Sequence, residues 1–204
     1  MKKFSLAVYL LLPLVMVSPC STFAQKMKVL SGNFEFLKGQ QELNVVFDYT
    51  PMTFYNEKMS ENDYLEKRNK DISANKGTNE AENWKNDWAY SKSTAFPNKF
   101  FASMNKNCAI ATGSKESAPY TLVVQTTWIY PGWFAGVMKQ HAKVTTLLKF
   151  IETANPANVL LEINSEKAPG DFDFVGIPNT NDRIAEGYAK TAKSLAKLIT
   201  KKIK

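Results

Sequence analysis

Hydrophobic and polar residues alternate with a period of two near the start of the chain, between residues 28 and 55. Leu43, Val45 and Phe47 fall on one side of this alternation. Such a pattern is typical of half-buried strands, in which every second side chain faces the core. Lys38–Gln41 combines a glycine with polar residues, as turns do. The segment is therefore predicted to open the fold as a β-hairpin.

The spacing becomes helical between residues 60 and 106. Apolar residues recur there at intervals of three and four, and Trp84 and Trp88 lie one turn apart. Lys76–Asn79 interrupts the pattern with a glycine, whereas Pro97 is tolerated because it falls in the first turn of a helix. The pattern predicts three helices, over residues 61–72, 80–91 and 95–105.

Strand signals return after residue 107. Four segments are interpreted as strands, of which the first is weak and the second is rich in β-branched residues, and short turn signals such as Asn155-Pro156 separate them. Sequential strands with such short links pair antiparallel. The chain is therefore predicted to continue as a meander, with strands over residues 108–112, 120–130, 144–153 and 159–164.

The end of the chain carries the clearest amphipathic pattern. Its apolar stripe recurs at three-and-four spacing and consists of Ile184, Tyr188, Ala192, Leu195, Ile199 and Ile203. Lysines occupy the opposite side, and Thr180 or Asn181 is the predicted N-cap. The predicted fold class is α+β: a single antiparallel or mixed sheet, made from the N-terminal hairpin and the C-terminal meander, with helices mainly on one face and a long C-terminal amphipathic helix.

Residues 1–24 have the charged, apolar and small-residue order of a secretory signal peptide. The apolar run is shorter than the roughly 20 residues that a membrane-spanning helix needs. Cleavage after Ala24 would leave residues 25–204 as a single α+β domain, exported to the periplasm or secreted. The alternative is a lipid anchor on Cys20, for which Pro19 is a poor preceding residue because a lipobox places a small side chain there.

The charge balance at first suggests nucleic acid. The chain of 204 residues has 26 Lys plus Arg against 19 Asp plus Glu, a net charge of +7 that falls to +5 when Lys2 and Lys3 leave with the signal. Arg68 and Arg183 are its only arginines. Specific recognition of phosphates and bases depends on the arginine fork, so nucleic acid is not a predicted partner.

Much of the remaining positive charge lies on the outer face of the terminal helix. These lysines could contact an anionic membrane, although a solvated face explains them without any partner. They are Lys190, Lys193, Lys197 and Lys201.

Few residues are available for catalysis or metal binding. His141 is the only histidine, and Cys108 is the only cysteine outside the signal segment. No tetrahedral zinc set can be built from them, and neither a cofactor nor a catalytic residue is predicted. Cys108 opens an apolar stretch and is interpreted as a small buried hydrophobe, and His141 lies in a polar stretch typical of a surface loop.

The most unusual segment is 128–136, which combines aromatic residues with two glycines and a proline at the end of a predicted strand. Aromatic rings in such a loop could stack on sugar rings, apolar ligands or the surface of a partner. The alternative is that Trp128 and Trp133 close one end of the core. The candidate ligand-binding residues are Trp128, Tyr130, Trp133 and Phe134.

A second candidate site is acidic. Asp171 and Asp173 would point to the same side of an extended segment. Paired carboxylates can bind Ca²⁺ or act as acid and base in glycoside hydrolysis. An edge strand with Phe172 and Phe174 facing inward explains the same alternation.

Several segments together resemble small uncharacterised exported proteins of Bacteroides-type bacteria. They include Thr22–Gln25, Leu43–Tyr49, the tryptophan-rich helix, Tyr130-Pro131-Gly132 and Arg183–Lys190. The resemblance implies a cell-envelope setting and carries over no activity. Two hypotheses follow: a non-enzymatic domain that binds a protein, glycan or other envelope component through the aromatic loop, or a glycan-directed hydrolase that uses the paired carboxylates.

Overall fold

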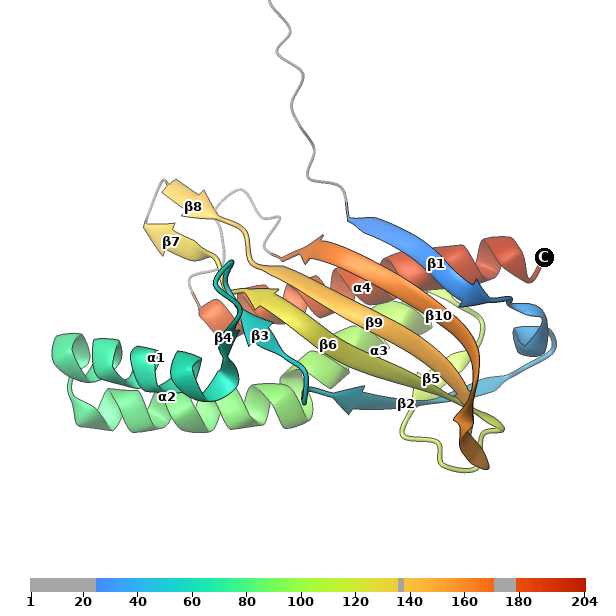
Figure 1. Ribbon diagram of the computed structural model, residues 1–204, viewed down its shortest axis with the longest axis horizontal. Coiled ribbons are helices and arrows are strands. Elements are labelled where there is room, and N and C mark those ends of the chain that lie inside the picture. Colours follow the sequence, from blue (N-terminus) through green and yellow to red (C-terminus); the bar gives the residue numbers. More distant parts are fainter. Residues whose placement is uncertain (1–24, 136–137, 171–178) are drawn as a thin grey trace, which may run out of the picture.

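Eight strands form one mixed sheet, and helices cover one of its faces (Figure 1). The structure is a computed structural model that describes residues 25–135, 138–170 and 179–204. The strands of the main sheet are β1 (Lys26–Gly32), β2 (Glu42–Asp48), β3 (Thr53–Phe54), β4 (Met59–Ser60), β5 (Ala111–Gly113), β6 (Tyr120–Tyr130), β9 (Lys143–Glu152) and β10 (Asn155–Pro169). A separate small sheet pairs β7 (Trp133–Ala135) with β8 (Met138–Gln140).

The helical elements come mainly from the middle and the end of the chain. They are η1 (Glu35–Leu37), α1 (Glu61–Lys76), α2 (Thr78–Tyr90), η2 (Ser91–Ala95), α3 (Phe96–Asn107) and α4 (Thr180–Lys202). None of the helices in the described part of the chain is long and apolar enough to span a membrane. The predicted signal segment, residues 1–24, lies outside the described residues.

The sheet mixes parallel and antiparallel pairs in the order β1-β10-β9-β6-β2-β5, with β3 beside β6 and β4 beside β3. Strands β6, β9 and β10 follow one another antiparallel, which confirms the core of the predicted meander. The expected first strand of that meander is wrong. Cys108 ends α3 by donating its backbone N–H to the Met104 carbonyl (2.9 Å), and the short β5 that follows runs parallel to β2.

The predicted N-terminal hairpin is also wrong, because β1 and β2 lie on different sides of the meander (Figure 1). β1 pairs antiparallel with β10, whereas β2 lies parallel to β6. The helical turn η1 stands between β1 and β2, with Leu37 fully buried. This buried turn anchors the chain as it passes across the end of the sheet, so the glycine-containing turn at Lys38–Gln41 does not fold it back on β1.

The second and third predicted helices are joined by a π-helical turn. Phe96 donates its backbone N–H to the carbonyl of Ser91, five residues back. Pro97 follows at once and has no N–H to donate, so a wider turn at this point lets the helix continue where a regular hydrogen bond is missing. The predicted gap between residues 91 and 95 is therefore helical.

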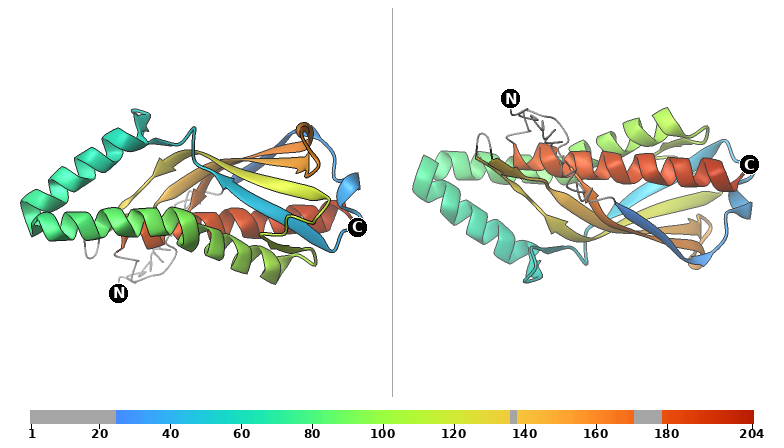
Figure 2. Two further views of the ribbon diagram at one scale, coloured as in Figure 1. Left: turned by 90° about the horizontal axis from the view of Figure 1, so that it is seen from below. Right: turned by 90° about the horizontal axis from the view of Figure 1, so that it is seen from above.

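Helix α4 packs its predicted apolar stripe on the sheet. Ile184, Tyr188, Leu195 and Ile199 are all fully buried, and Figure 2 shows α3 and α4 side by side on one face of the sheet. The N-cap is Asn179 rather than Thr180 or Asn181, since its side-chain oxygen accepts hydrogen bonds from two backbone N–H groups of the first turn.

The lysines on the outer side of α4 are largely solvated. Lys193, Lys197 and Lys201 are exposed, as the amphipathic pattern predicts.

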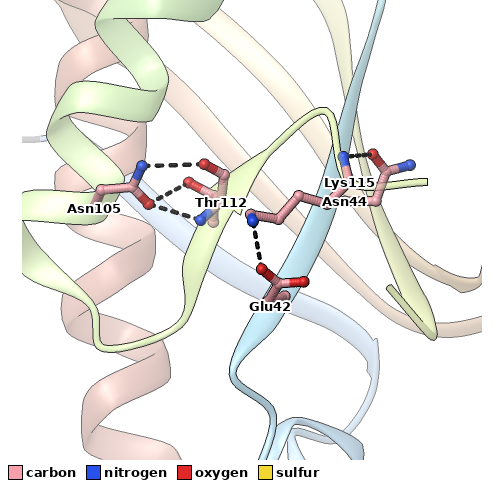
Figure 3. A network of polar contacts seen from close by, with 5 residues as sticks. All are labelled: Glu42, Asn44, Asn105, Thr112 and Lys115. Carbon is pink, nitrogen blue, oxygen red and sulfur yellow. Dashed lines mark hydrogen bonds and ion pairs between the residues drawn. The ribbon is translucent and has the colours of Figure 1, made fainter. Parts of the chain in front are cut away.

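A polar network fixes one end of the sheet (Figure 3). Asn44 of β2 donates to the hydroxyl of Thr121 (3.0 Å) and accepts from the backbone N–H of Lys115 (2.8 Å). Asn105 of α3 accepts from both the backbone N–H and the hydroxyl of Thr112 and donates to its carbonyl. These bonds join β2, β5, β6 and α3.

At the other end, α1 and α2 form a helical pair that extends past the sheet (Figures 1 and 2). The first turn of α1 is fixed by Ser60, whose hydroxyl accepts the backbone N–H of Asp63 (3.2 Å). The first part of α1, the β3–β4 unit, the turn after β6 and the start of α4 meet here. The candidate site lies at this meeting point.

Candidate ligand-binding site

Two of the predicted aromatic residues, Trp128 and Tyr130, lie at the end of β6 and share one face of the strand. The rings of Trp128 and Tyr130 stack with centroids 6.3 Å apart and planes inclined by 21°. The indole N–H of Trp128 donates to the carbonyl of Tyr55 (2.6 Å), and the Tyr55 ring meets that of Tyr130 edge-on at 5.9 Å. Both predicted residues are half-buried, so each keeps part of its ring accessible while its orientation is fixed.

The third aromatic residue, Trp133, lies on the small β7–β8 sheet and is 44% exposed. Its indole N–H donates to the side-chain oxygen of Gln140 (3.0 Å), its partner across the two strands. The hydroxyl of Tyr130 donates to the same oxygen. One glutamine therefore orients two aromatic rings. Trp133 does not close the core, which was the alternative considered for it.

The turn between β6 and β7 requires glycine. Gly132 has a φ of 67°, which residues other than glycine rarely adopt. A Cβ atom at this position would lie 2.3 Å from the backbone oxygen of Gln140. At Gly132 the chain therefore passes close to the backbone of residues 140–142, directly before Trp133 begins β7.

The β7–β8 sheet carries a second exposed apolar side chain beside Trp133. Met138 is 62% exposed and pairs with Ala135. Since directly paired residues of antiparallel strands project from the same face, and this face alternates along a strand, Trp133 and Met138 share a face. We refer to Trp128, Tyr130 and Trp133 as the aromatic surface, which Met138 extends.

The other sequence candidates are placed only in part. Phe134 lies in β7, with its backbone paired to that of Lys139. Asp171 and Asp173 lie outside the described residues, so the proposal of an acidic site stays a prediction. Cys108 is only partly buried and packs at the edge of the core. Within the described ranges, no group of three or more metal-ligating residues is placed to hold an ion.

A cavity of about 220 Å³ opens beside the aromatic surface. We call it the arginine cavity, because both arginines of the chain line it. Its walls come from α1, the β3–β4 unit, the β6–β7 turn and the start of α4, and they consist of Tyr55, Tyr64, Arg68, Pro131, Gly132, Trp133, Thr180 and Arg183. Trp133 thus belongs both to the aromatic surface and to the wall of the cavity.

The polar groups of the cavity differ in how they are satisfied. Arg183 is 2% exposed and donates to the Thr180 hydroxyl (3.0 Å). Tyr64 is fully buried, and its hydroxyl has no hydrogen-bond partner among the described residues. The Nε of Arg68 also has none within that part of the chain, and its guanidinium group lies 5.6 Å from the centroid of the Trp84 ring.

The two tyrosines of the cavity are hydrogen-bond donors at neutral pH. Burial raises the pKa of Tyr64 well above its usual value, and the nearby guanidinium groups of Arg68 and Arg183 only partly oppose this shift. Burial likewise raises the pKa of Tyr55, again opposed by Arg68. Both phenols therefore keep their protons at neutral pH.

Sequence reasoning did not find this cavity. One feature of the sequence could have indicated it: lysine supplies nearly all the positive charge of the chain, and arginine occurs at only two positions. This scarcity was used to exclude nucleic acid. It could also have suggested that Arg68 and Arg183 share one task, but only the fold brings them to the same cavity.

Fold and site together define an α+β domain with an aromatic surface beside a small, arginine-lined cavity. No protein-family model matches the sequence, and no curated protein matches it. Among solved structures, the chain is similar to the PelC dodecamer from Paraburkholderia phytofirmans at 15% identity, over 83% of this chain and 96% of that one, with a TM-score of 0.38. A point variant of that PelC is 13% identical over 87% and 96% of the two chains, also with a TM-score of 0.38. Such values support no conclusion about function.

Proposed function

We propose that the protein is an exported, non-enzymatic binding domain of the cell envelope and that it holds its ligand on the aromatic surface. One observation carries the proposal: Trp133 is 44% exposed and yet is held in place by a hydrogen bond to Gln140. Exposure of the apolar indole ring to water is unfavourable, so covering it with a ligand gains free energy. Because the ring is already fixed in position, it loses little conformational entropy when the ligand binds. Such preorganised aromatic anchors dominate many binding sites.

A saccharide is the ligand that this surface fits best. The faces of Trp133 and of the Trp128–Tyr130 pair can cover the C–H face of a sugar ring, while Gln140 offers an amide at its edge. The surface lies on strands rather than on a long loop, which favours a rigid site over an adaptable one. The proposal does not depend on Asp171 or Asp173.

The test compares Trp133→Ala with the matched variant Tyr90→Ala. Tyr90 is 60% exposed and lies on α2, away from the aromatic surface and the arginine cavity. Each variant and the parent protein are titrated with a panel of oligosaccharides by calorimetry. We expect Trp133→Ala to weaken binding at least tenfold, as loss of an aromatic anchor does, and Tyr90→Ala to leave it unchanged.

Two results would contradict the proposal. One is a parent protein that binds no oligosaccharide of the panel. The other is a Trp133→Ala variant that folds as the parent does and binds with the same affinity.

A further inference from the structure

We infer that the arginine cavity binds a carboxylate of the saccharide held on the aromatic surface, with Arg68 and the Tyr64 hydroxyl as donors. This inference deepens the proposed function and rests on it for the body of the ligand. The ligand class is an acidic sugar, such as a hexuronic acid. Its ring would lie on Trp133, which also lines the cavity, and its charged group would enter the cavity.

The first argument is where the chain uses arginine. Lys and Arg together number 26, yet only Arg68 and Arg183 are arginines, and both line this one cavity. A guanidinium group presents a planar fork of donors that matches a carboxylate, whereas a lysine acts as a point charge. The two arginines come from α1 and α4, so the tertiary structure, not local sequence, brings them together.

The second argument is the hydroxyl of Tyr64. The ring is fully buried and stacks on that of Phe54, with centroids 4.0 Å apart and planes 5° from parallel. A phenylalanine would fill the same space. The hydroxyl instead remains buried without a partner among the described residues, which costs folding free energy unless a ligand accepts a hydrogen bond from it. A carboxylate oxygen in the cavity would be that acceptor.

The third argument is the side chain of Arg68. Its Nε is buried and, within the described ranges, bonds to nothing, and no described carboxylate forms an ion pair with it. The guanidinium group lies over the ring of Trp84, a cation–π contact that uses none of its hydrogen-bond donors. Asp71 and Asp87 line the adjoining cavity together with Arg68, so an anionic ligand would be directed to the Tyr64 side.

The start of α4 adds to the positive potential. Thr180, the first residue of this 23-residue helix, lines the cavity, and its hydroxyl accepts a hydrogen bond from Arg183. Helix N-termini favour anions through their free N–H groups and dipole. Here Asn179 caps two of those N–H groups, so the helix supports the site and the side chains supply most of the donors.

The size of the cavity limits what enters it. At about 220 Å³ it is smaller than sites that enclose a drug-sized molecule. A carboxylate fits within this volume, and the ring that carries it would lie outside on the indole of Trp133. This geometry distinguishes a carboxylate attached to a ring from a free oxyanion, which would gain nothing from the aromatic surface.

The experiment compares glucuronate with glucose, which differ in having a carboxylate or a hydroxymethyl group at one carbon. Binding to the parent protein is followed by tryptophan fluorescence and by calorimetry, with inorganic phosphate and sulfate as further probes. We expect glucuronate to bind at least tenfold more tightly than glucose. Arg68→Gln should remove this preference, and Tyr64→Phe should weaken glucuronate binding severalfold.

Two control variants separate the site from general effects. Lys201→Gln removes one positive charge from the exposed end of α4, and Tyr188→Phe removes a buried hydroxyl that is bonded to Thr126. Neither should alter the preference for glucuronate.

Four outcomes would overturn the inference. Equal binding of glucuronate and glucose to the parent protein is one, and a preference that survives Arg68→Gln in a folded variant is the second. Phosphate or sulfate binding as tight as that of glucuronate would show a site for free oxyanions. Loss of all sugar binding in Trp133→Ala with no effect of Arg68→Gln or Tyr64→Phe would leave the proposed function standing and remove only the carboxylate site.

Discussion

At the β2–β5 end of the sheet, the amide of Asn44 meets a partner at both its nitrogen and its oxygen, whereas at the α1 end the hydroxyl of Tyr64 meets none among the described residues. Both side chains are buried. Buried polar groups that are fully paired stabilise a unique arrangement of strands, and unpaired ones weaken the fold. The difference suggests that one end of the sheet is organised for stability and the other for a ligand.

The largest effect is expected from breaking the paired end. Asn44→Ala removes both hydrogen bonds and leaves the backbone N–H of Lys115 without its acceptor. We expect a loss of about 3 kcal/mol in the free energy of unfolding, measured with urea. Asn75→Ala is the control, because the Asn75 side chain bonds only to a backbone carbonyl on an exposed helix face; it should change stability by less than about 0.5 kcal/mol.

A smaller effect is expected from straining the backbone turn at Gly132, near the α1 end of the sheet. Gly132→Ala introduces a Cβ atom into a left-handed turn and against the Gln140 backbone. We expect a loss of about 2 kcal/mol and easier quenching of Trp133 fluorescence by acrylamide. In Gly113→Ala the added atom meets nothing within 4 Å, so this variant should keep the parent's stability and quenching. Equal behaviour of the two alanine variants would contradict the strained turn.

The finest test contrasts two buried tyrosine hydroxyls. Tyr188→Phe breaks the bond to Thr126 (2.8 Å) and should cost about 1 kcal/mol, because it leaves the buried Thr126 hydroxyl unpaired. Tyr64→Phe removes a hydroxyl that has no partner in the described part of the chain, and it should keep or slightly raise stability without ligand. Thermal unfolding of both variants decides the matter. A destabilised Tyr64→Phe would show that this hydroxyl already contributes to the fold.

The sequence pattern predicted the elements whose structure depends on neighbours along the chain. The stripe from Ile184 to Ile199 set the buried face of α4, and the strand signals in 120–130 and 144–153 located the central strands. These signals are periodic and local, so a single sequence contains them. The pairing of β1 with β10 is not local. Nothing near Lys26 in the sequence indicates a partner at Glu166.

The candidate site divides in the same way. Trp128, Tyr130 and Trp133 are close in sequence, and their composition alone drew attention to them. Tyr64, Arg68 and Arg183 are ordinary residues of two separate helices when the sequence is read in order. Their shared cavity depends on how α1 and α4 approach the turn at Gly132, a tertiary arrangement that periodicity does not report.

The position of Gln140 has a consequence for selectivity. Its side-chain oxygen accepts from both Tyr130 and Trp133, which fixes the amide in one of its two flipped orientations. The nitrogen is then the atom of that amide with protons left to give. With the phenol of Tyr64 and the guanidinium of Arg68, the site consists chiefly of donors. The ammonium group of a protonated amino sugar is positively charged and has only donors to offer. Both the charge and the hydrogen-bond polarity of the site therefore select against it.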